Sequence, residues 1–486
     1  MEAAHQSQSP ESGRSFGSAG TALSIVLALA SGLTLRLWML RNFFQLDGDP
    51  LIYGGIAKNL ILHGRYALTV PGGETYPTLI RLPGYPLFLA LCFRLFGMEN
   101  YASAAWVQIA LELVGCLLLA DFARRIARPG IGSGAAHCTL WLAALCPFTA
   151  VYAANPMAEA PTLFLLALAL WSAGRFVARP GWGPALWFTV AVTLTALLRP
   201  DGALVAVALA PALVIGLRKS HRPTGLRKGG WARMAAVCVL LALLPFAAWT
   251  WRNWRAFHVI EPLTSRMATD PGEDPHDGWE RWVKTWCLDF VSTYDIYWNV
   301  PGSPLEMSKL PDRAFDSADQ RARTAALAAN YNKNLEIDHE IDERFAQLAE
   351  ERIAAHPLRY YFWLPLGRLA DMTLRPRVEN LPIDLDWWVY AHHNVETRFS
   401  WAYAGLNLFY LLLGIGGLLL RLRLWGAMLA YILLRSALLT TIAAPEARYT
   451  LEFFPMLFAL GGIALYRSTN WVWLSVLSLK ASAGKG

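Results

Sequence analysis

Charged residues are scarce in this chain of 486 residues, because Asp, Glu, Lys and Arg together make up only 16% of it, against about 25% in an average soluble domain. Hydrophobic residues make up 55% and fall in repeated long runs. This composition excludes an ordinary soluble fold and predicts an all-α polytopic membrane protein. The net charge of +7 does not indicate a nucleic-acid partner, because the basic residues form short clusters between the apolar runs.

Cysteine pairs, a cleavage signal and internal repeats are also rare or missing. The chain has six Cys, and no two of them are spaced as CxxC, so the sequence supports neither a zinc site nor a disulfide framework. No small-residue cleavage signal follows the first apolar run, which is therefore predicted to be a retained span and not a signal peptide. No internal repeat is visible, whereas inverted repeats are common in transporters.

Ten apolar runs approach the roughly 20 residues that a membrane-spanning helix needs. They are predicted as spans at Thr21–Met39, Tyr101–Ala120, Gly134–Ala153, Ala160–Val177, Ala185–Leu198, Ala203–Leu217, Met234–Trp251, Trp401–Leu420, Trp425–Ile442 and Leu451–Tyr466. A further run, Pro83–Phe96, is only about fourteen residues long, which favours an interfacial or re-entrant helix over a span.

Basic residues alternate with the loops between these runs. Clusters follow the even-numbered spans, whereas the short loops after the third, fifth and ninth contain only Arg199 and Arg448. Positive charge marks cytoplasmic loops, so both termini are predicted to be cytoplasmic. The predicted organisation is a disordered cytoplasmic tail (1–20), a transmembrane module (21–252) with a first outer loop (43–100), an extracytoplasmic segment (253–400), C-terminal transmembrane helices (401–470) and a cytoplasmic tail (471–486).

The extracytoplasmic segment is predicted to contain ordered helices. A stretch rich in Ala, Glu and Arg predicts one long helix from about Ala314 to Ala355. The amphipathic stretch Tyr360–Leu374 follows it and is predicted to lie on the membrane surface.

Two carboxylates stand directly after the first span, at Asp47 and Asp49. Such a pair at the mouth of a helical bundle can act as a general base or coordinate a cation. The alternative is that both residues form a turn and cap a helix that starts near Pro50. The two interpretations do not exclude each other.

Three further charged residues are candidates at the outer ends of spans. Glu159 opens the fourth span, where it is either a functional group at the membrane edge or a solvated residue favoured by the helix dipole. Arg81 and Arg448 carry planar guanidinium groups that suit a phosphate. An arginine at this depth can also simply extend toward the lipid headgroups.

The order of these motifs resembles a known family. The first outer loop reads Asp49-x-x-x-Tyr53 and later Arg81-Leu-Pro-Gly-Tyr-Pro, Asn155-Pro-Met-Ala-Glu159 opens the fourth span, and Glu446-Ala-Arg448-Tyr449 opens the last. Together with the large outer segment after the seventh span, this order resembles the GT-C fold glycosyltransferases. It is most similar to the branch that holds the protein O-mannosyltransferases, the bacterial aminoarabinose transferase and the rhizobial lipopolysaccharide core transferases.

The resemblance implies transfer of a sugar from a polyprenyl-phosphate donor to an envelope lipid, glycan or protein on the outer face of the cytoplasmic membrane. It implies that Asp49, four positions before Tyr53, is the catalytic base, with Asp47 as its neighbour and no firm counterpart. By the same resemblance Glu159 helps to place a substrate or an ion, Arg81 lies near the donor phosphate, and Arg448-Tyr449 matches a C-terminal pair.

Three further expectations concern the reaction, its countercharge and a rival function. The expected reaction inverts the anomeric configuration, with the pKa of the base raised by its membrane-edge environment. A divalent cation, Mg²⁺ or Mn²⁺, is an open alternative to arginine as the countercharge for the phosphate. The rival function is a transporter or lipid flippase, which needs polar groups or broken helices near the bilayer midplane.

Overall fold

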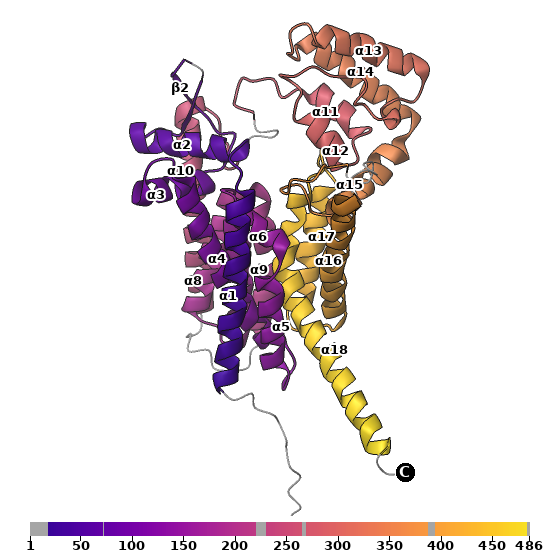
Figure 1. Cartoon of the computed structure of the whole chain (residues 1–486). Helices are drawn as coiled ribbons and strands as arrows, with labels where there is room; N and C mark the ends of the chain where they lie inside the picture. Colours follow the sequence, from indigo (N-terminus) through magenta and orange to yellow (C-terminus); the bar gives the residue numbers. More distant parts are fainter. Residues whose placement is uncertain (1–17, 71, 220–229, 265–268, 387–393, 484–486) are drawn as a thin grey trace, which may run out of the picture.

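The computed structural model describes residues 18–70, 72–219, 230–264, 269–386 and 394–483. The described part of the chain is almost entirely helical, with one short β-hairpin. Figure 1 shows a bundle of long helices that carries a smaller helical domain and the α2–α3 region at the same end. The predicted all-α polytopic membrane fold is confirmed.

Each of the ten predicted spans coincides with a helix or a pair of helices. The bundle consists of α1 (Ser18–Phe43), α4 (Tyr101–Ile126), α5 (Gly132–Ala144), α6 (Pro147–Ala153), α7 (Glu159–Ala178), α8 (Trp182–Leu198), α9 (Leu204–Lys219), α10 (Gly230–Phe257), α16 (Asn394–Leu419), α17 (Trp425–Leu439) and α18 (Phe454–Ala483). Within the described ranges, six helices are long and apolar enough to cross a bilayer, and α5 and α6 pass the same test when taken together as a pair that is bent by 55°. Helices α8, α9 and α17 are shorter.

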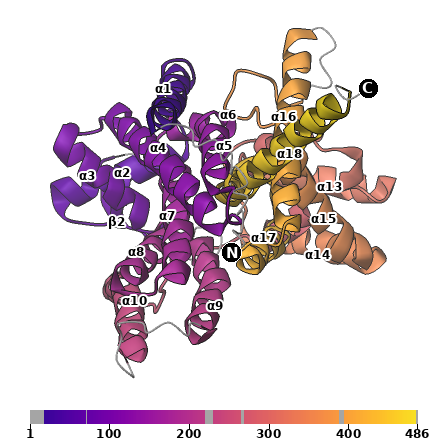
Figure 2. The same cartoon turned by 90° about the horizontal axis from the view of Figure 1, so that it is seen from below.

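The bundle has two groups of helices, as the view from below shows (Figure 2). Helices α1 and α4 to α10 form one group, and α16 to α18 form the other. Helix α18 packs against both α16 and α5, so it joins the two groups. Their shared core includes Phe122, Phe148 and Phe454, which are fully buried or nearly so.

The third predicted span is not one straight helix, because it breaks between Ala144 and Pro147. Proline has no backbone N–H, and the carbonyl groups at a helix end need other partners. Arg36 of α1 supplies one of these partners, since its guanidinium donates to the backbone oxygen of Ala144 (2.7 Å). The same guanidinium pairs with the Glu112 carboxylate (2.7 Å), which neutralises it inside the bundle.

The first predicted outer loop forms a compact unit at the upper end of the bundle (Figure 1). It contains α2 (Asp49–His63), β1 (Ala67–Thr69), β2 (Thr75–Pro77) and α3 (Gly84–Phe96). The strands pair antiparallel, with Leu68 opposite Tyr76. Helix α3 matches the predicted short helix at Pro83–Phe96, and its 13 residues fall short of the ~20 that a span requires.

The second predicted outer segment folds into a domain with its own aromatic core. It comprises α11 (Asp277–Lys284), α12 (Phe290–Ser292), the π-helical turn η3 (Thr293–Tyr297), the 3₁₀ turn η4 (Asp312–Ala314), α13 (Ala318–Tyr331), α14 (His339–Ala355), the π-helical turn η5 (Arg359–Trp363) and α15 (Leu364–Leu374). Trp282, Trp286 and Phe345 are fully buried in this core. The predicted amphipathic stretch Tyr360–Leu374 corresponds to η5 and α15.

The single long helix predicted from Ala314 to Ala355 is wrong. Two helices, α13 and α14, replace it. Between them Leu335 adopts a left-handed backbone conformation (φ 60°), which ends a right-handed helix. A new N-terminus follows, where the Asp338 carboxylate accepts a hydrogen bond from the backbone N–H of Ile341 (2.8 Å).

Candidate active site

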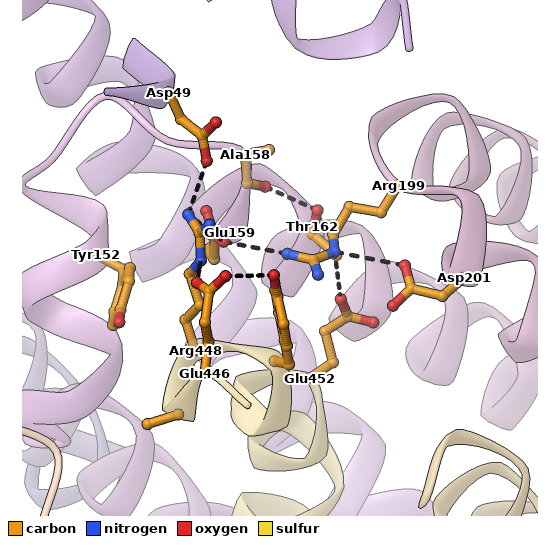
Figure 3. A network of polar contacts seen from close by, with 12 residues as sticks. Asp49, Tyr152, Ala158, Glu159, Thr162, Arg199, Asp201, Glu446, Arg448 and Glu452 are labelled. Atoms are coloured by element: carbon orange, nitrogen blue, oxygen red, sulfur yellow. Dashed lines mark hydrogen bonds and ion pairs between the residues drawn. The ribbon is translucent and has the colours of Figure 1, made fainter. Parts of the chain in front are cut away.

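Asp49 lies in the first turn of α2 and is held by two arginines from distant parts of the chain. Its Oδ1 atom accepts from Arg81 (2.7 Å), and its Oδ2 atom accepts from Arg448 (2.9 Å). Gly48 is the N-cap residue of α2, and no side chain caps this helix end. The carboxylate of Asp49 therefore does not cap the helix but joins the first outer loop to the start of the last span (Figure 3).

The two arginines control the ionisation of Asp49. Burial by itself would raise the pKa of this carboxyl, but the charges and hydrogen bonds of Arg448 and Arg81 outweigh burial and lower the pKa to about 2. The expectation of a raised pKa is therefore wrong for the protein without substrate. Asp49 is ionised, and each of its oxygen atoms already has a guanidinium partner.

Arg81 is fixed by the loop that precedes α3. The Tyr66 hydroxyl donates to the backbone oxygen of Arg81 (2.9 Å). The guanidinium lies 5.8 Å from the ring centroid of Tyr53, within the range of a cation–π contact. Tyr53 in turn packs edge to face against Tyr85. The predicted Asp49, Tyr53 and Arg81 thus gather at one place.

Arg448 belongs to η6 (Ala447–Phe453), a 3₁₀ helix that leads into α18. Its Nε atom pairs with the Glu446 carboxylate, which also accepts a hydrogen bond from the Tyr449 hydroxyl. Arg377, which follows α15, holds η6 in place, because its guanidinium donates to the backbone oxygen of Ala447 (2.8 Å) and to the Thr450 hydroxyl. The Arg448 guanidinium therefore pairs with Glu446 through Nε and with Asp49 through Nη1.

A second layer of charges lies next to Asp49 and reaches into the bundle. Glu159, at the start of α7, is 5% exposed and therefore is not the solvated residue of the alternative interpretation. Its carboxylate lies 3.1 Å from Arg199 and 3.8 Å from Arg448. Arg199 also pairs with Asp201 and Glu452 (Figure 3).

Arg435 closes this layer from α17. Its guanidinium is fully buried and pairs with Asp201 (2.7 Å) and Glu452 (2.8 Å). The connected residues, here called the charge network, are Asp49, Glu159, Asp201, Glu446, Glu452, Arg81, Arg199, Arg435 and Arg448. Five carboxylates against four arginines give the network a formal charge of −1 when all are ionised.

The turn between α6 and α7 ties the network to the loop before Asp49. The side-chain amide of Gln108 donates to the backbone oxygen of Asn155 (2.6 Å). The side-chain oxygen of Asn155 accepts from the backbone N–H of Gln45 (2.7 Å). The Asn155-Pro-Met-Ala-Glu159 motif therefore positions Glu159 and also fixes the chain four residues before Asp49.

Asp47 stays apart from the other predicted site residues. It is exposed in the linker between α1 and α2, and no side-chain hydrogen bond or ion pair to the described residues engages it. The sequence hypotheses missed five members of the charge network: Asp201, Glu446, Glu452, Arg199 and Arg435. Two of them had a signal, since Glu446 stands two positions before Arg448 and Arg199 is one of the two cations in the short outer loops.

The arrangement does not fit a resident metal ion. Among the residues that the structure describes, no group of three or more His, Cys, Asp or Glu side chains could hold one. Both Asp49 oxygen atoms and the Glu159 carboxylate face guanidinium groups, which would repel a cation. The countercharge available to a phosphate here is arginine.

Part of the sequence matches a known protein family, and the fold is similar to that of solved structures. Residues 79–251 match the family model described as dolichyl-phosphate-mannose-protein mannosyltransferase. This region includes Arg81, Glu159, Arg199 and Asp201, whereas Asp49 and Arg448 lie outside it. No sequence among the curated proteins matches the chain.

Solved structures similar to this chain include two of the Archaeoglobus fulgidus oligosaccharyltransferase and one of ArnT from Cupriavidus metallidurans. The oligosaccharyltransferase tethered to an acceptor peptide is 14% identical (TM-score 0.49, 95% of this chain and 51% of that chain). Its complex with an inhibitory peptide and dolichol-phosphate is 12% identical (TM-score 0.49, 95% and 52%). ArnT bound to undecaprenyl phosphate is 14% identical (TM-score 0.38, 93% and 78%).

The chain thus spans about half the length of the oligosaccharyltransferase that it matches. The resemblance seen in the sequence, to transferases that use a polyprenyl-phosphate sugar, is confirmed by the family model over residues 79–251, which carry the pattern of the dolichyl-phosphate-mannose-protein mannosyltransferases.

Proposed function

We propose that this protein is a membrane glycosyltransferase, which moves a sugar from a polyprenyl-phosphate donor to an acceptor hydroxyl on the outer face of the cytoplasmic membrane. The observation that carries the proposal is the placement of Asp49 between Arg81 and Arg448. A carboxylate can take the proton of an attacking hydroxyl, and guanidinium groups can stabilise a phosphate leaving group. These two needs of the reaction meet within one salt-bridged group.

The proposed step is a direct displacement at the anomeric carbon. The acceptor oxygen forms a bond to that carbon while the bond from the carbon to the phosphate oxygen breaks, so the configuration inverts. The proton of the acceptor hydroxyl moves to Asp49. The phosphate leaves with both electrons of the broken bond, and its charge changes from −1 to −2.

This step transfers the arginine interactions from the base to the leaving group. Asp49 loses its charge when it takes the proton, while the phosphate gains one in the same step. Arg81 and Arg448 therefore lose attraction for Asp49 as their attraction for the phosphate grows. Such a change stabilises the transition state more than the ground state, which is the requirement for catalysis.

A carboxylate with a low pKa is a weak base, and donor binding explains how Asp49 can still take a proton. A donor phosphate that engages Arg81 and Arg448 draws them away from Asp49. Burial, which by itself raises the pKa of Asp49, then acts with less opposition. We infer that Asp49 becomes a useful base only when the donor is bound, which limits proton uptake to the productive complex.

The topology assigned to this function has both termini in the cytoplasm. The α2–α3 region and the α11–α15 domain lie at one end of the bundle (Figure 1). Asp49, in the first turn of α2, places the site at the same end. An exposed side chain on α14 offers a direct test. Gln347→Cys should react with a membrane-impermeant thiol reagent in intact spheroplasts, with the unsubstituted protein as the control for the native Cys residues. Labelling only after lysis would contradict the orientation.

The rival transporter function would need an open polar site inside the bundle, and the break between α5 and α6 does not provide one among the described residues. The Arg36 guanidinium is fully buried and already bound to the backbone and to Glu112. The adjoining cavity, lined by Glu112, Cys116 and Phe458, has a volume of about 20 Å³. That volume admits about one water molecule and no lipid headgroup.

The experiment that tests the function is mass spectrometry of envelope lipids, glycans and proteins in a strain lacking the protein. A glycosylated species should disappear and should return with the unsubstituted protein but not with Asp49→Asn. The acceptor would be identified by the same spectra. If no glycosylated species changes, the proposed transfer is wrong.

A further inference from the structure

A turn from the outer domain reaches the edge of the charge network. It follows α15 and is closed by a hydrogen bond from the backbone N–H of Leu381 to the backbone oxygen of Val378 (2.9 Å). Glu379 and Asn380 occupy its two central positions. Val378 is fully buried in the core of the bundle, so the turn is anchored to the bundle.

Two contacts fix this turn to the elements of the site. Arg377, the residue before Val378, binds η6, which carries Arg448. On the other side, the Tyr152 hydroxyl of α6 donates to one carboxylate oxygen of Glu379 (3.0 Å). Tyr152 is close enough to Glu159 and Arg448 for their charges to act on its hydroxyl, and Figure 3 draws it beside Arg448.

Two polar atoms of the turn are buried without a hydrogen-bond partner in the described structure. They are the second carboxylate oxygen of Glu379 and the side-chain nitrogen of Asn380. A buried polar atom without a partner is costly, and few native proteins retain one without a reason. The glycosyltransfer mechanism above uses neither residue.

The polarity of these two atoms identifies the kind of ligand. The carboxylate oxygen can only accept a hydrogen bond, whereas the amide nitrogen can only donate one. A metal ion would satisfy the oxygen and repel the amide N–H. A phosphate would satisfy the amide and be repelled by the carboxylate. A sugar hydroxyl both donates and accepts, so two neighbouring hydroxyls satisfy both atoms.

We propose that the turn Val378–Leu381 and Tyr152 form a sugar-binding subsite, in which Glu379 accepts a hydrogen bond from one sugar hydroxyl and Asn380 donates one to another. The proposal rests on the glycosyltransferase function above and adds specificity-determining residues to it. Tyr152 binds one oxygen of the Glu379 carboxylate and leaves the second without a partner. The sugar comes either from the donor lipid or from a glycan acceptor.

The test uses the full-length protein in lipid nanodiscs, with Glu379→Gln as the variant. Glutamine keeps the shape of Glu379 but places an N–H where the carboxylate oxygen accepted. Asp384→Asn is the matched control, because it removes a carboxylate from an exposed position in the same loop. The probes are undecaprenyl phosphate, which has no sugar, and its mannosyl, glucosyl and galactosyl phosphodiesters.

If the donor sugar occupies the subsite, Glu379→Gln should weaken binding of the sugar-bearing lipid that the unsubstituted protein prefers by about tenfold or more. Binding of undecaprenyl phosphate should stay within about twofold, since the phosphate does not touch Glu379. The same contrast is expected for Asn380→Ala. Asp384→Asn should bind all four lipids as the unsubstituted protein does.

If an acceptor glycan occupies the subsite, the variant should bind every donor lipid normally. The KM for the acceptor in envelope membranes from the deletion strain should then rise by about tenfold. Unchanged donor binding together with an unchanged acceptor KM would overturn the subsite, as would a loss of undecaprenyl phosphate binding, because that loss indicates a structural role. Failure of the unsubstituted protein to bind any of the four lipids would instead count against the proposed function.

Discussion

Two arginine–carboxylate clusters in this protein resemble each other in chemistry and differ in construction. The pair of Arg36 and Glu112 lies inside the bundle, with side chains that are 0% and 7% exposed. The cluster of Asp49, Arg81 and Arg448 lies at the end of the bundle, with side chains that are 21%, 22% and 18% exposed. Both join helices that are distant in sequence.

The difference lies in the other partners of each arginine. The remaining hydrogen bonds of Arg36 go to backbone oxygen atoms of Gly32, Ala143 and Ala144, which are part of the fold and cannot leave. Arg81 and Arg448 share Asp49, and a phosphate can replace a carboxylate without unfolding any helix. The first cluster is therefore suited to stabilise a broken span, and the second is suited to exchange partners with a substrate.

Breaking the cluster of Asp49, Arg81 and Arg448 should have the largest effect on activity. Asp49→Asn keeps the shape of the side chain but cannot accept the acceptor proton, so the transfer rate should fall by about 10²- to 10⁴-fold. Thermal unfolding should confirm that the variant is folded. Asp47→Asn, at the exposed neighbour outside the network, should transfer sugar at nearly the unsubstituted rate. Should the two variants exchange these outcomes, Asp47 is the base.

Breaking the pair of Arg36 and Glu112 should lower the stability of the protein and leave the rate of sugar transfer unchanged. Arg36→Met leaves Glu112 buried without a countercharge, which costs about 3–5 kcal/mol. The midpoint of thermal unfolding should drop, while turnover per folded molecule is preserved. Arg36→Met with Glu112→Met should recover part of the loss, because no unpaired charge remains. Arg128→Met, at an exposed position, is the control. A selective loss of turnover in Arg36→Met would make this pair part of the site.

The shape of the guanidinium can be tested separately from its charge. Arg448→Lys keeps the positive charge but loses the planar fork that contacts Asp49 and Glu446 together. The KM for the donor should rise by about tenfold or more, from the loss of one charge-assisted hydrogen bond. Arg467→Lys, at an exposed position in α18, the helix that follows η6, should leave the KM unchanged. An unchanged donor KM and turnover for Arg448→Lys would leave Arg81 as the phosphate ligand.

The sequence predicted the helical bundle and the order of its spans, because long apolar runs report directly on burial in a bilayer. It also indicated Asp49, Arg81, Glu159 and Arg448, which the structure brings together. It did not indicate that Asp49 and Arg448, 399 positions apart, contact each other, since hydropathy carries no information on pairing between distant segments.

Other features also depend on contacts between segments that are distant in sequence. The low pKa of Asp49 follows from the number of arginines around it, which only the fold determines. The break in the third predicted span had a signal at Pro147, but the partner that stabilises the break, Arg36, lies on another helix. The division between α13 and α14 depends on a left-handed Leu335, a residue type that does not favour this conformation.

The smallest expected effect concerns pH, and it addresses the exchange of partners itself. The pKa of Asp49 is lowered to about 2 without substrate, from about 3.9 in an unfolded chain. The stability that its two arginines provide is therefore present above about pH 4 and is lost as the pH falls toward 2.

The value of kcat/KM for the donor reports the free protein, so ionisation of Asp49 should produce no acid limb in the pH profile of kcat/KM above about pH 4. The value of kcat reports the donor-bound protein, in which the arginines have turned to the phosphate and the pKa of Asp49 has risen. Its acid limb should therefore lie at higher pH than that of kcat/KM. Arg81→Gln removes one cation from free Asp49 and should move the limb of kcat/KM upward, toward that of kcat. Acid limbs at the same pH in both parameters of the unsubstituted protein would mean that the arginines stay on Asp49 throughout the reaction.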